Sequence, residues 1–213
     1  MPIQTTRRKF LNKGCLIAAG AGVAVCAGGG VFAAYQPKID QPSASDGDPA
    51  SSQRVLVAYA TKAGSTAEVA VKMGQLLAQR SLQVDVRPLA SVTGLAPYQA
   101  VVLGSAIRVG KLLPEAITFI QHNQSVLQQK VFSLFILCMT LATDNADNRK
   151  KVSAYLDPVR ALVKPASEGL FAGVMDLNKL KGIERLMIMA MKTPIGDFRQ
   201  WDQIGAWVEN VTT

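Results

Sequence analysis

The sequence predicts an α/β protein in which a five-stranded parallel sheet lies between helices, preceded by an N-terminal signal or anchor segment. Two observations support this prediction. From residue 54 onward, short apolar runs rich in β-branched residues alternate with segments of helical spacing, which is typical of βαβ units. Residues 14–37 carry no charged side chain and follow a basic cluster. We therefore divide the chain into a leader (1–37), a flexible linker (38–53) and one α/β domain (54–213).

The strands and helices of the domain follow from periodicity and from breaking residues. Val55 to Tyr59 is an apolar run with the length of a buried parallel strand, whereas Val84 and Val86 alternate with polar residues and predict a half-exposed strand. The predicted strands are 55–59, 83–87, 100–104, 131–137 and 169–173. The predicted helices are 66–80, one that begins at Pro114 and runs through Ile120, 146–163 and 201–211.

The composition excludes several classes of site. The chain has a net charge of +8, but its basic residues are scattered and no aromatic-interleaved basic patch suggests nucleic acid. An anionic cofactor or an anionic membrane surface suits this charge better. The chain has a single histidine, and two of its three cysteines (Cys15 and Cys26) lie in the leader. This argues against a zinc site, a histidine-based triad and a disulfide framework.

The leader resembles a twin-arginine export signal, because Thr6-Arg7-Arg8-Lys9-Phe10-Leu11 matches its [ST]-R-R-x-F-L pattern. The uncharged run 14–37 is about long enough to cross a bilayer, which takes roughly 20 residues. Positive charge before this run predicts that the domain lies on the extracytoplasmic side of the cell membrane or is exported. No clean A-x-A cleavage site follows, so an uncleaved anchor is favoured over a removed signal. Residues 38–53, rich in Pro, Ser, Asp and Ala, predict a flexible tether.

In a parallel sheet of this kind, ligands bind outside the carboxyl ends of the strands. The first loop at that edge joins the strand 55–59 to a helix and contains Gly64 with several hydroxyl side chains. A strand that turns into a helix leaves unpaired N–H groups at the helix start, and these suit a phosphate. The loop matches neither a Walker A sequence nor G-x-G-x-x-G. The alternative is an ordinary capped helix, with Ser65 or Thr66 as the cap and Glu68 in its first turn.

This loop resembles the phosphate loop of the flavodoxin family, [ST]-x-T-G-x-T. Thr61, Gly64 and Thr66 match the pattern, whereas Ala63 replaces a residue that often offers a hydroxyl. The resemblance implies a flavodoxin-like three-layer sandwich, FMN as the cofactor and a phosphate held by the loop. The implied phosphate-binding residues are Thr61, Lys62, Ala63, Gly64, Ser65 and Thr66.

Two further loops at the same edge would hold the flavin ring. After the strand 100–104, a Gly-Ser exit would let the backbone approach a planar ring, and Arg108 and Lys111 would supply positive charge beside it. The alternative is a surface turn with solvated cations. The loop after 131–137 has no Tyr or Trp to stack on the ring, so an aliphatic or Met contact would replace it. The implied ring-binding residues are Ser105, Ala106, Ile107, Arg108, Val109 and Gly110, with Cys138, Met139, Thr140 and Leu141.

The run V-V-L-G-S-A-I-R-V-G-K resembles one flavodoxin subgroup, which includes the bacterial flavodoxin-like protoporphyrinogen dehydrogenases that pass electrons to quinones. It implies an FMN-dependent oxidoreductase whose partner is a redox protein or a small molecule of the quinone or porphyrinogen type. No general acid or base is evident, so we name no catalytic residue. Two alternatives stay open: a non-enzymatic electron carrier, and a flavin-free binding module, to which Ala63 and the missing aromatic point.

Residues 180–192 have two interpretations. Ile183, Leu186, Met187 and Ala190 form one helical stripe, and further apolar residues lie on other faces. The segment is either part of the core, where Met fills irregular gaps, or a lid or membrane-dipping helix over the flavin. In the second interpretation, basic side chains meet lipid or substrate carboxylates; these are Lys179, Lys181, Arg185 and Lys192.

Overall fold

The computed structural model describes residues 37–191 and 193–212. The predicted export signal and nearly all of the predicted anchor, residues 1–36, lie outside the described residues. Two compact units are distinguished; among the described residues, the larger contains 38–179 and 193–212, and the smaller contains Pro37 and 180–191. Within the described ranges, no helix combines the length and the apolar character needed to cross a membrane.

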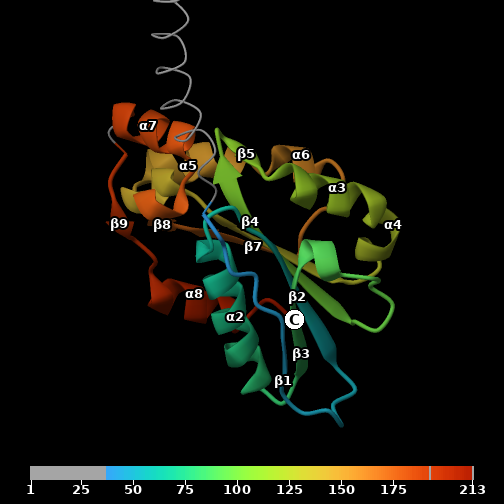
Figure 1. Ribbon diagram of the computed structural model, residues 1–213. Coiled ribbons are helices and arrows are strands. Elements are labelled where there is room, and N and C mark those ends of the chain that lie inside the picture. The colour runs from blue at the N-terminus through green and yellow to red at the C-terminus, as the bar shows by residue number, and fades with distance from the viewer. Residues whose placement is uncertain (1–36, 192, 213) are drawn as a thin grey trace, which may run out of the picture. The chain divides into compact units, whose positions relative to one another are not determined.

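The larger unit is built around one sheet whose order is β1-β3-β2-β4-β6-β7, with β5 paired to β4 (Figure 1). Its central five strands, β3-β2-β4-β6-β7, are all parallel, which confirms the predicted parallel sheet. A small antiparallel pair, β8 and β9, lies outside it. The strands are β1 (Ala44–Asp46), β2 (Arg54–Ala60), β3 (Gln83–Pro88), β4 (Ala100–Arg108), β5 (Lys111–Leu112), β6 (Val131–Leu137), β7 (Ser167–Phe171), β8 (Val174–Met175) and β9 (Gly196–Asp197).

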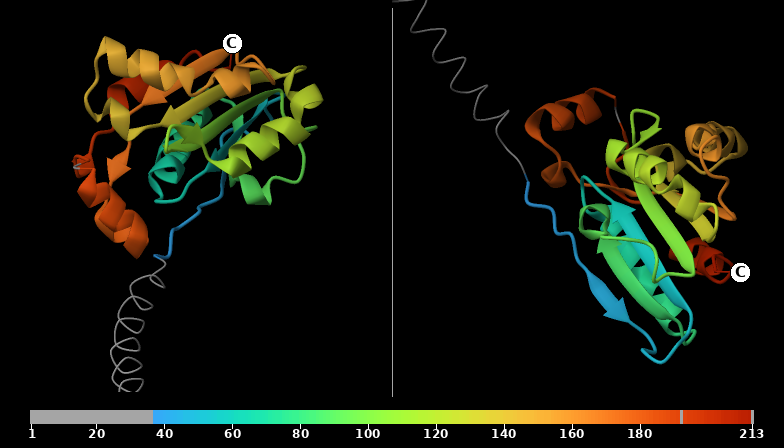
Figure 2. Two further views of the ribbon diagram at one scale, coloured as in Figure 1. Left: turned by 90° about the horizontal axis from the view of Figure 1, so that it is seen from above. Right: turned by 90° about the vertical axis from the view of Figure 1, so that its right-hand side faces the viewer.

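Helices cover both faces of the sheet and make three layers (Figures 1 and 2). One face carries α2 (Ser65–Ala78) and α8 (Trp201–Val208). The other carries α3 (Pro114–His122), α4 (Gln124–Leu127), α5 (Ala146–Ala154) and α6 (Asp157–Arg160). Short 3-10 helices are η1 (Leu89–Ser91), η2 (Met139–Ala142) and η3 (Leu177–Lys179). The smaller unit contributes α7 (Gly182–Ala190).

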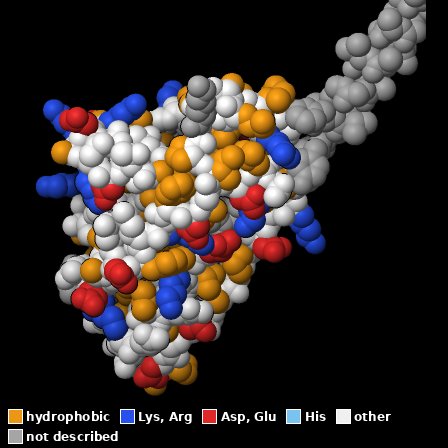
Figure 3. Space-filling model, turned by 90° about the vertical axis from the view of Figure 1, so that its left-hand side faces the viewer, with side chains coloured by type: hydrophobic (Ala, Val, Ile, Leu, Met, Phe, Trp, Pro, Cys, Tyr) orange, Lys and Arg blue, Asp and Glu red, His pale blue; other side chains and the backbone are white. Residues whose placement is uncertain are grey.

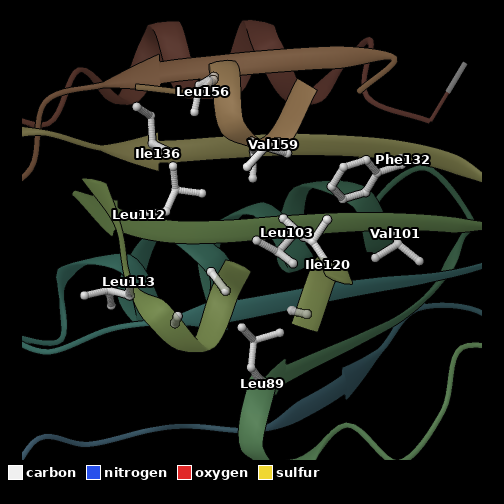
Figure 4. Close-up of a cluster of buried hydrophobic side chains, with 14 of the residues drawn as sticks. Leu89, Val101, Leu103, Leu112, Leu113, Ile120, Phe132, Ile136, Leu156 and Val159 are labelled. Carbon is white, nitrogen blue, oxygen red and sulfur yellow. The ribbon is translucent and has the colours of Figure 1, made fainter. Parts of the chain in front are cut away.

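Alternation along β2 divides the core into two parts. Val57 and Tyr59 face the cluster that includes Met73 of α2, whereas Leu56 and Ala58 belong to the cluster on the opposite face. Figure 4 shows that second cluster, where side chains from the sheet meet those of the covering helices. Strands β2, β4 and β6 are buried on both faces, which explains why they read as apolar runs in the sequence.

Three sequence predictions need correction. Residues 146–163 form two helices, because Pro158 in the first turn of α6 has no N–H for the hydrogen bond that would continue α5. Part of the predicted linker, Ala44–Asp46, is an edge strand antiparallel to β3. The predicted loop after residue 104 is a hairpin, because β4 continues to Arg108 and pairs with β5.

Candidate functional site

The loop between β2 and α2 has the backbone of an anion site. Gly64 is the residue before the helix, with φ of 92°, and its N–H donates to the Thr61 hydroxyl oxygen at 2.9 Å. No side chain caps the helix. The alternative with Ser65 or Thr66 as an ordinary cap is therefore wrong: both residues lie inside the first turn. The first N–H groups of α2, which have no intrahelical partner, are left for an external acceptor.

Thr66 supplies the clearest sign of a missing partner. The residue is 0% exposed, and within the described part of the chain its hydroxyl makes no hydrogen bond. A buried hydroxyl without a partner is costly, so native structures usually satisfy such groups. A phosphate oxygen at the start of α2 would accept a hydrogen bond from it. The residues present therefore fit a phosphate group, even though Ala63 lacks a hydroxyl.

The loops after β2, β6 and β7 meet near one residue, Gly173. A Cβ built on Gly173 would lie 3.5 Å from Leu137 Cβ, 3.8 Å from Ser65 Oγ and 4.0 Å from Met139 Sδ. The phosphate loop and η2 are thus neighbours, as the rule for parallel sheets predicts. Lys62, also expected at the phosphate, is exposed and forms an ion pair with Glu115 of α3 at 2.8 Å.

The predicted ring-binding residues of the third parallel strand divide into two groups. Ser105 is buried and holds the hairpin together, because its Oγ accepts from the Leu113 N–H at 3.1 Å and donates to the Ala106 carbonyl at 3.0 Å. Ala106, Ile107 and Arg108 are half-buried and stay candidates for the ring. The turn residues Val109 and Gly110 have φ of 49° and 70°, as a two-residue hairpin turn requires, and Val109 is 94% exposed.

The residues after β6 divide in the same way. Cys138 and Leu141 are buried in the hydrophobic core. Met139 and Thr140 are half-buried. Met139 and Thr140 are therefore the residues of this loop that would contact a flavin ring.

A charged network beside the phosphate loop was not predicted from the sequence. Glu68, in the first turn of α2, accepts from Arg199 Nη1 at 2.6 Å and from Lys179 Nζ at 3.3 Å. Burial alone would raise the pKa of Glu68, but hydrogen bonds from Arg199 and Lys179 outweigh it and hold that pKa below its usual value. Arg199 also forms an ion pair with Asp197 at 2.5 Å, and its Cζ atom lies 4.7 Å from the centre of the Trp201 ring.

Sequence spacing carried little signal for this network, because Glu68 is more than 100 residues from both Lys179 and Arg199. On the face shown in Figure 3, basic and acidic side chains of the described residues lie next to one another.

The strand order, the helices on both faces and the uncapped loop after the first parallel strand define the class of flavodoxin-like α/β proteins. The flavodoxin domain family matches residues 56–200, and the chain belongs to this family. Proteins of this family bind FMN. No curated protein matches the chain.

Solved structures that resemble the chain include several flavodoxins. A flavodoxin from the domain Archaea is 16% identical, with a TM-score of 0.43 over 66% of this chain and 99% of that one. The Streptococcus pneumonia TIGR4 flavodoxin is 17% identical, with a TM-score of 0.43 over 65% of this chain and 99% of that one. Oxidised flavodoxin 2 from Bacillus cereus is 20% identical, with a TM-score of 0.41 over 65% of this chain and 99% of that one.

Proposed function

We propose that this chain binds one FMN non-covalently and transfers electrons or hydride on the extracytoplasmic side of a membrane. The observation that carries the proposal is the uncapped start of α2 beside the buried, partnerless hydroxyl of Thr66, in a chain of the flavodoxin family. When bound, the flavin supplies the redox chemistry, and the protein supplies binding, orientation and electrostatics.

Different residues at this edge of the sheet would bind different parts of the cofactor. The N–H groups at the start of α2 and the Thr66 hydroxyl would hold the phosphate. The half-buried residues Ala106 to Arg108 and the pair Met139 and Thr140 would border the ring. Arg108 would favour negative charge on the ring, because a nearby cation stabilises it.

The FMN site is tested on the purified full-length chain in detergent. We expect a flavin absorption spectrum and one FMN per chain. Thr66→Val keeps the side-chain shape but removes the hydroxyl, and we expect it to weaken FMN binding about tenfold. Thr93→Val, at an exposed position, is the matched control. A wild-type chain that takes up no FMN would refute the proposal in favour of a flavin-free binding module.

For the reaction, we propose an oxidoreductase of the protoporphyrinogen dehydrogenase (quinone) type, on the resemblance of residues 101–111. The FMN-loaded chain should oxidise a porphyrinogen when a quinone is the acceptor. A chain that exchanges electrons with a redox protein but leaves the porphyrinogen unchanged would be an electron carrier instead. Both outcomes require the flavin, so this assay is carried out on a chain that the binding test has shown to hold FMN.

We also propose that α7 contacts an anionic lipid surface. Five large apolar side chains of this segment are more than half exposed, which disagrees with the interpretation that the whole segment is core: Ile183 (60%), Leu186 (51%), Met187 (54%), Met189 (56%) and Met191 (70%). Exposed Lys181 and Arg185 lie on the same helix or at its start. Exposed apolar residues together with basic ones are typical of helices that lie in a membrane interface.

The lipid contact is tested by fluorescence in vesicles that contain anionic lipid. A probe is attached through Met187→Cys in a chain whose Cys15 and Cys26 are serine, and brominated lipid is the quencher. We expect strong quenching at position 187 and little at a probe attached through Thr93→Cys. Equal quenching at both positions would contradict the proposed contact.

A further inference from the structure

We propose that Lys179 is a ligand of the cofactor phosphate, supplied from the segment after β8 and held beside the phosphate loop by Glu68. The inference rests on the proposed FMN site and adds a cation to it that neither the loop sequence nor the strand order indicates.

Lys179 lies at the glycine of the loop. A Cβ built on Gly64 would be 3.6 Å from Lys179 Nζ, and the same nitrogen is 3.3 Å from Glu68 Oε1. The ammonium group is therefore next to both the residue before α2 and the helix's first turn. Its backbone is held by η3, in which the Lys179 N–H donates to the Asp176 carbonyl at 3.1 Å.

Lys179 and Arg199 share Glu68, but they are not held equally. The Arg199 side chain is 11% exposed and is bound by Asp197 and Glu68 together. The Lys179 side chain is 42% exposed, and its contact to Glu68 is the longer of the two. Lys179 can therefore turn toward a new anion while Glu68 keeps Arg199 as its partner, so no carboxylate is left unpaired.

Electrostatics favour this exchange. A phosphate monoester carries about −1.5 to −2 charges near neutral pH, whereas Glu68 offers one charge that Arg199 already shares. The positive end of the α2 dipole, about half a charge, attracts the same phosphate. The ammonium group of Lys179 would also replace the hydrogen-bond donor that Ala63 lacks. Lys62 is less suited to this role, because Glu115 holds it at 2.8 Å.

The proposal predicts a preference for FMN over riboflavin, which has the same ring but no phosphate. We would measure the dissociation constants of both flavins on the full-length chain in detergent by the quenching of flavin fluorescence. Lys179→Gln should weaken FMN binding about tenfold and leave riboflavin binding unchanged. Lys179→Arg should restore most of the FMN affinity, because it keeps the charge.

Three further measurements separate a direct contact from a general effect. Lys72→Gln removes the same charge from an exposed position on α2 and should change FMN binding less than twofold. Raising the salt concentration should weaken FMN binding more in the wild-type chain than in Lys179→Gln. Inorganic phosphate should compete with FMN more strongly in the wild-type chain than in that variant.

The outcomes distinguish this inference from the function on which it rests. A wild-type chain that binds no FMN refutes the proposed function. A wild-type chain that binds FMN while Lys179→Gln binds it equally well refutes only the role of Lys179. A parallel loss of FMN and riboflavin binding in Lys179→Gln would also refute it, since that pattern indicates a structural change.

Discussion

Among the described residues, Asp85 and Glu68 are carboxylates that are each paired with two cations, at different places in the same unit. Asp85 on β3 has a side chain that is 2% exposed and is paired with Arg54 at 2.6 Å and Arg87 at 3.2 Å. Glu68 on α2 has a side chain that is 49% exposed and is paired with Arg199 and Lys179. Each carboxylate is paired with two cations, but the exposure of the two side chains differs greatly.

Because of this difference in exposure, we assign Asp85 a structural role and Glu68 a role beside the ligand. Asp85 also accepts from the Ser45 hydroxyl at 2.5 Å and the Tyr98 hydroxyl at 3.0 Å, so one buried group ties β1, β2 and the segment before β4 to β3. Loss of a partner there leaves a buried polar group unsatisfied. Exposed ion pairs contribute only about 0–1 kcal/mol, so the pair of Glu68 with Lys179 can open and re-form around a ligand.

The largest effect is expected from Asp85→Asn, which removes the buried charge and keeps the shape. The two arginines are about one-third exposed and can regain water, so we expect a loss of about 2–3 kcal/mol rather than the full cost of a broken buried pair. Thermal unfolding followed by circular dichroism should show a melting temperature lower by about 5–10 °C. Asp46→Asn on the same edge is the control, and equal effects of the two variants would contradict the comparison.

The pH dependence of stability should report the ionisation of Asp85. Burial alone would raise the pKa of Asp85, but hydrogen bonds from Ser45, Arg54 and Tyr98 outweigh it and hold that pKa below its usual value. A carboxyl whose pKa is lowered in the folded state stabilises the fold above its unfolded pKa, about 3.9, and loses this contribution as the pH falls through the folded pKa.

We therefore expect the melting temperature to fall below about pH 4, and to fall less steeply in Asp85→Asn than in the wild-type chain. Melting curves recorded between neutral pH and pH 2 test this. Parallel curves for the two proteins would show that other carboxyl groups are responsible.

A smaller effect is expected at the phosphate loop itself, where the backbone rather than a charge sets the geometry. Gly64→Ala places a Cβ at φ of 92°, which costs about 1–2 kcal/mol, although the space beside it is adequate. Gly94→Ala is the control, because nothing lies within 4 Å of its Cβ position. Melting temperatures and FMN affinity should both fall only in the first variant. An unchanged Gly64→Ala would mean that the loop adapts without strain.

The smallest change in stability is expected from Glu68→Gln, at most about 1 kcal/mol, because the carboxylate is half exposed. Its effect on the cofactor should have the opposite sign to that of Lys179→Gln. Removal of the competing charge should tighten FMN binding about threefold. Glu209→Gln, an exposed residue at the end of α8, is the control. Weaker FMN binding in Glu68→Gln would show that Glu68 is needed to position the loop.

The parts of the structure that could be predicted depend on local patterns. The apolar runs of β2, β4 and β6 can be recognised in the sequence, because these strands are buried on both faces and must be mostly apolar. Val55 to Thr66 also predicted the strand–loop–helix of the phosphate site, since the requirement for glycine at Gly64 is a property of that turn alone. The periodicity of residues 146–163 predicts one helix, because the apolar spacing continues across Pro158, whereas the structure has two helices there.

The amino-acid order alone therefore specified the α/β class, the parallel sheet and the position of the phosphate loop, because local propensity and hydrophobic periodicity encode them. Folding in three dimensions decided the rest. It buried Asp85 beneath two arginines, added Ala44–Asp46 to the edge of the sheet, and brought Lys179 and Arg199 to Glu68. These contacts join residues that are distant in the chain, and the free energy of such a contact depends on burial, which no local pattern records.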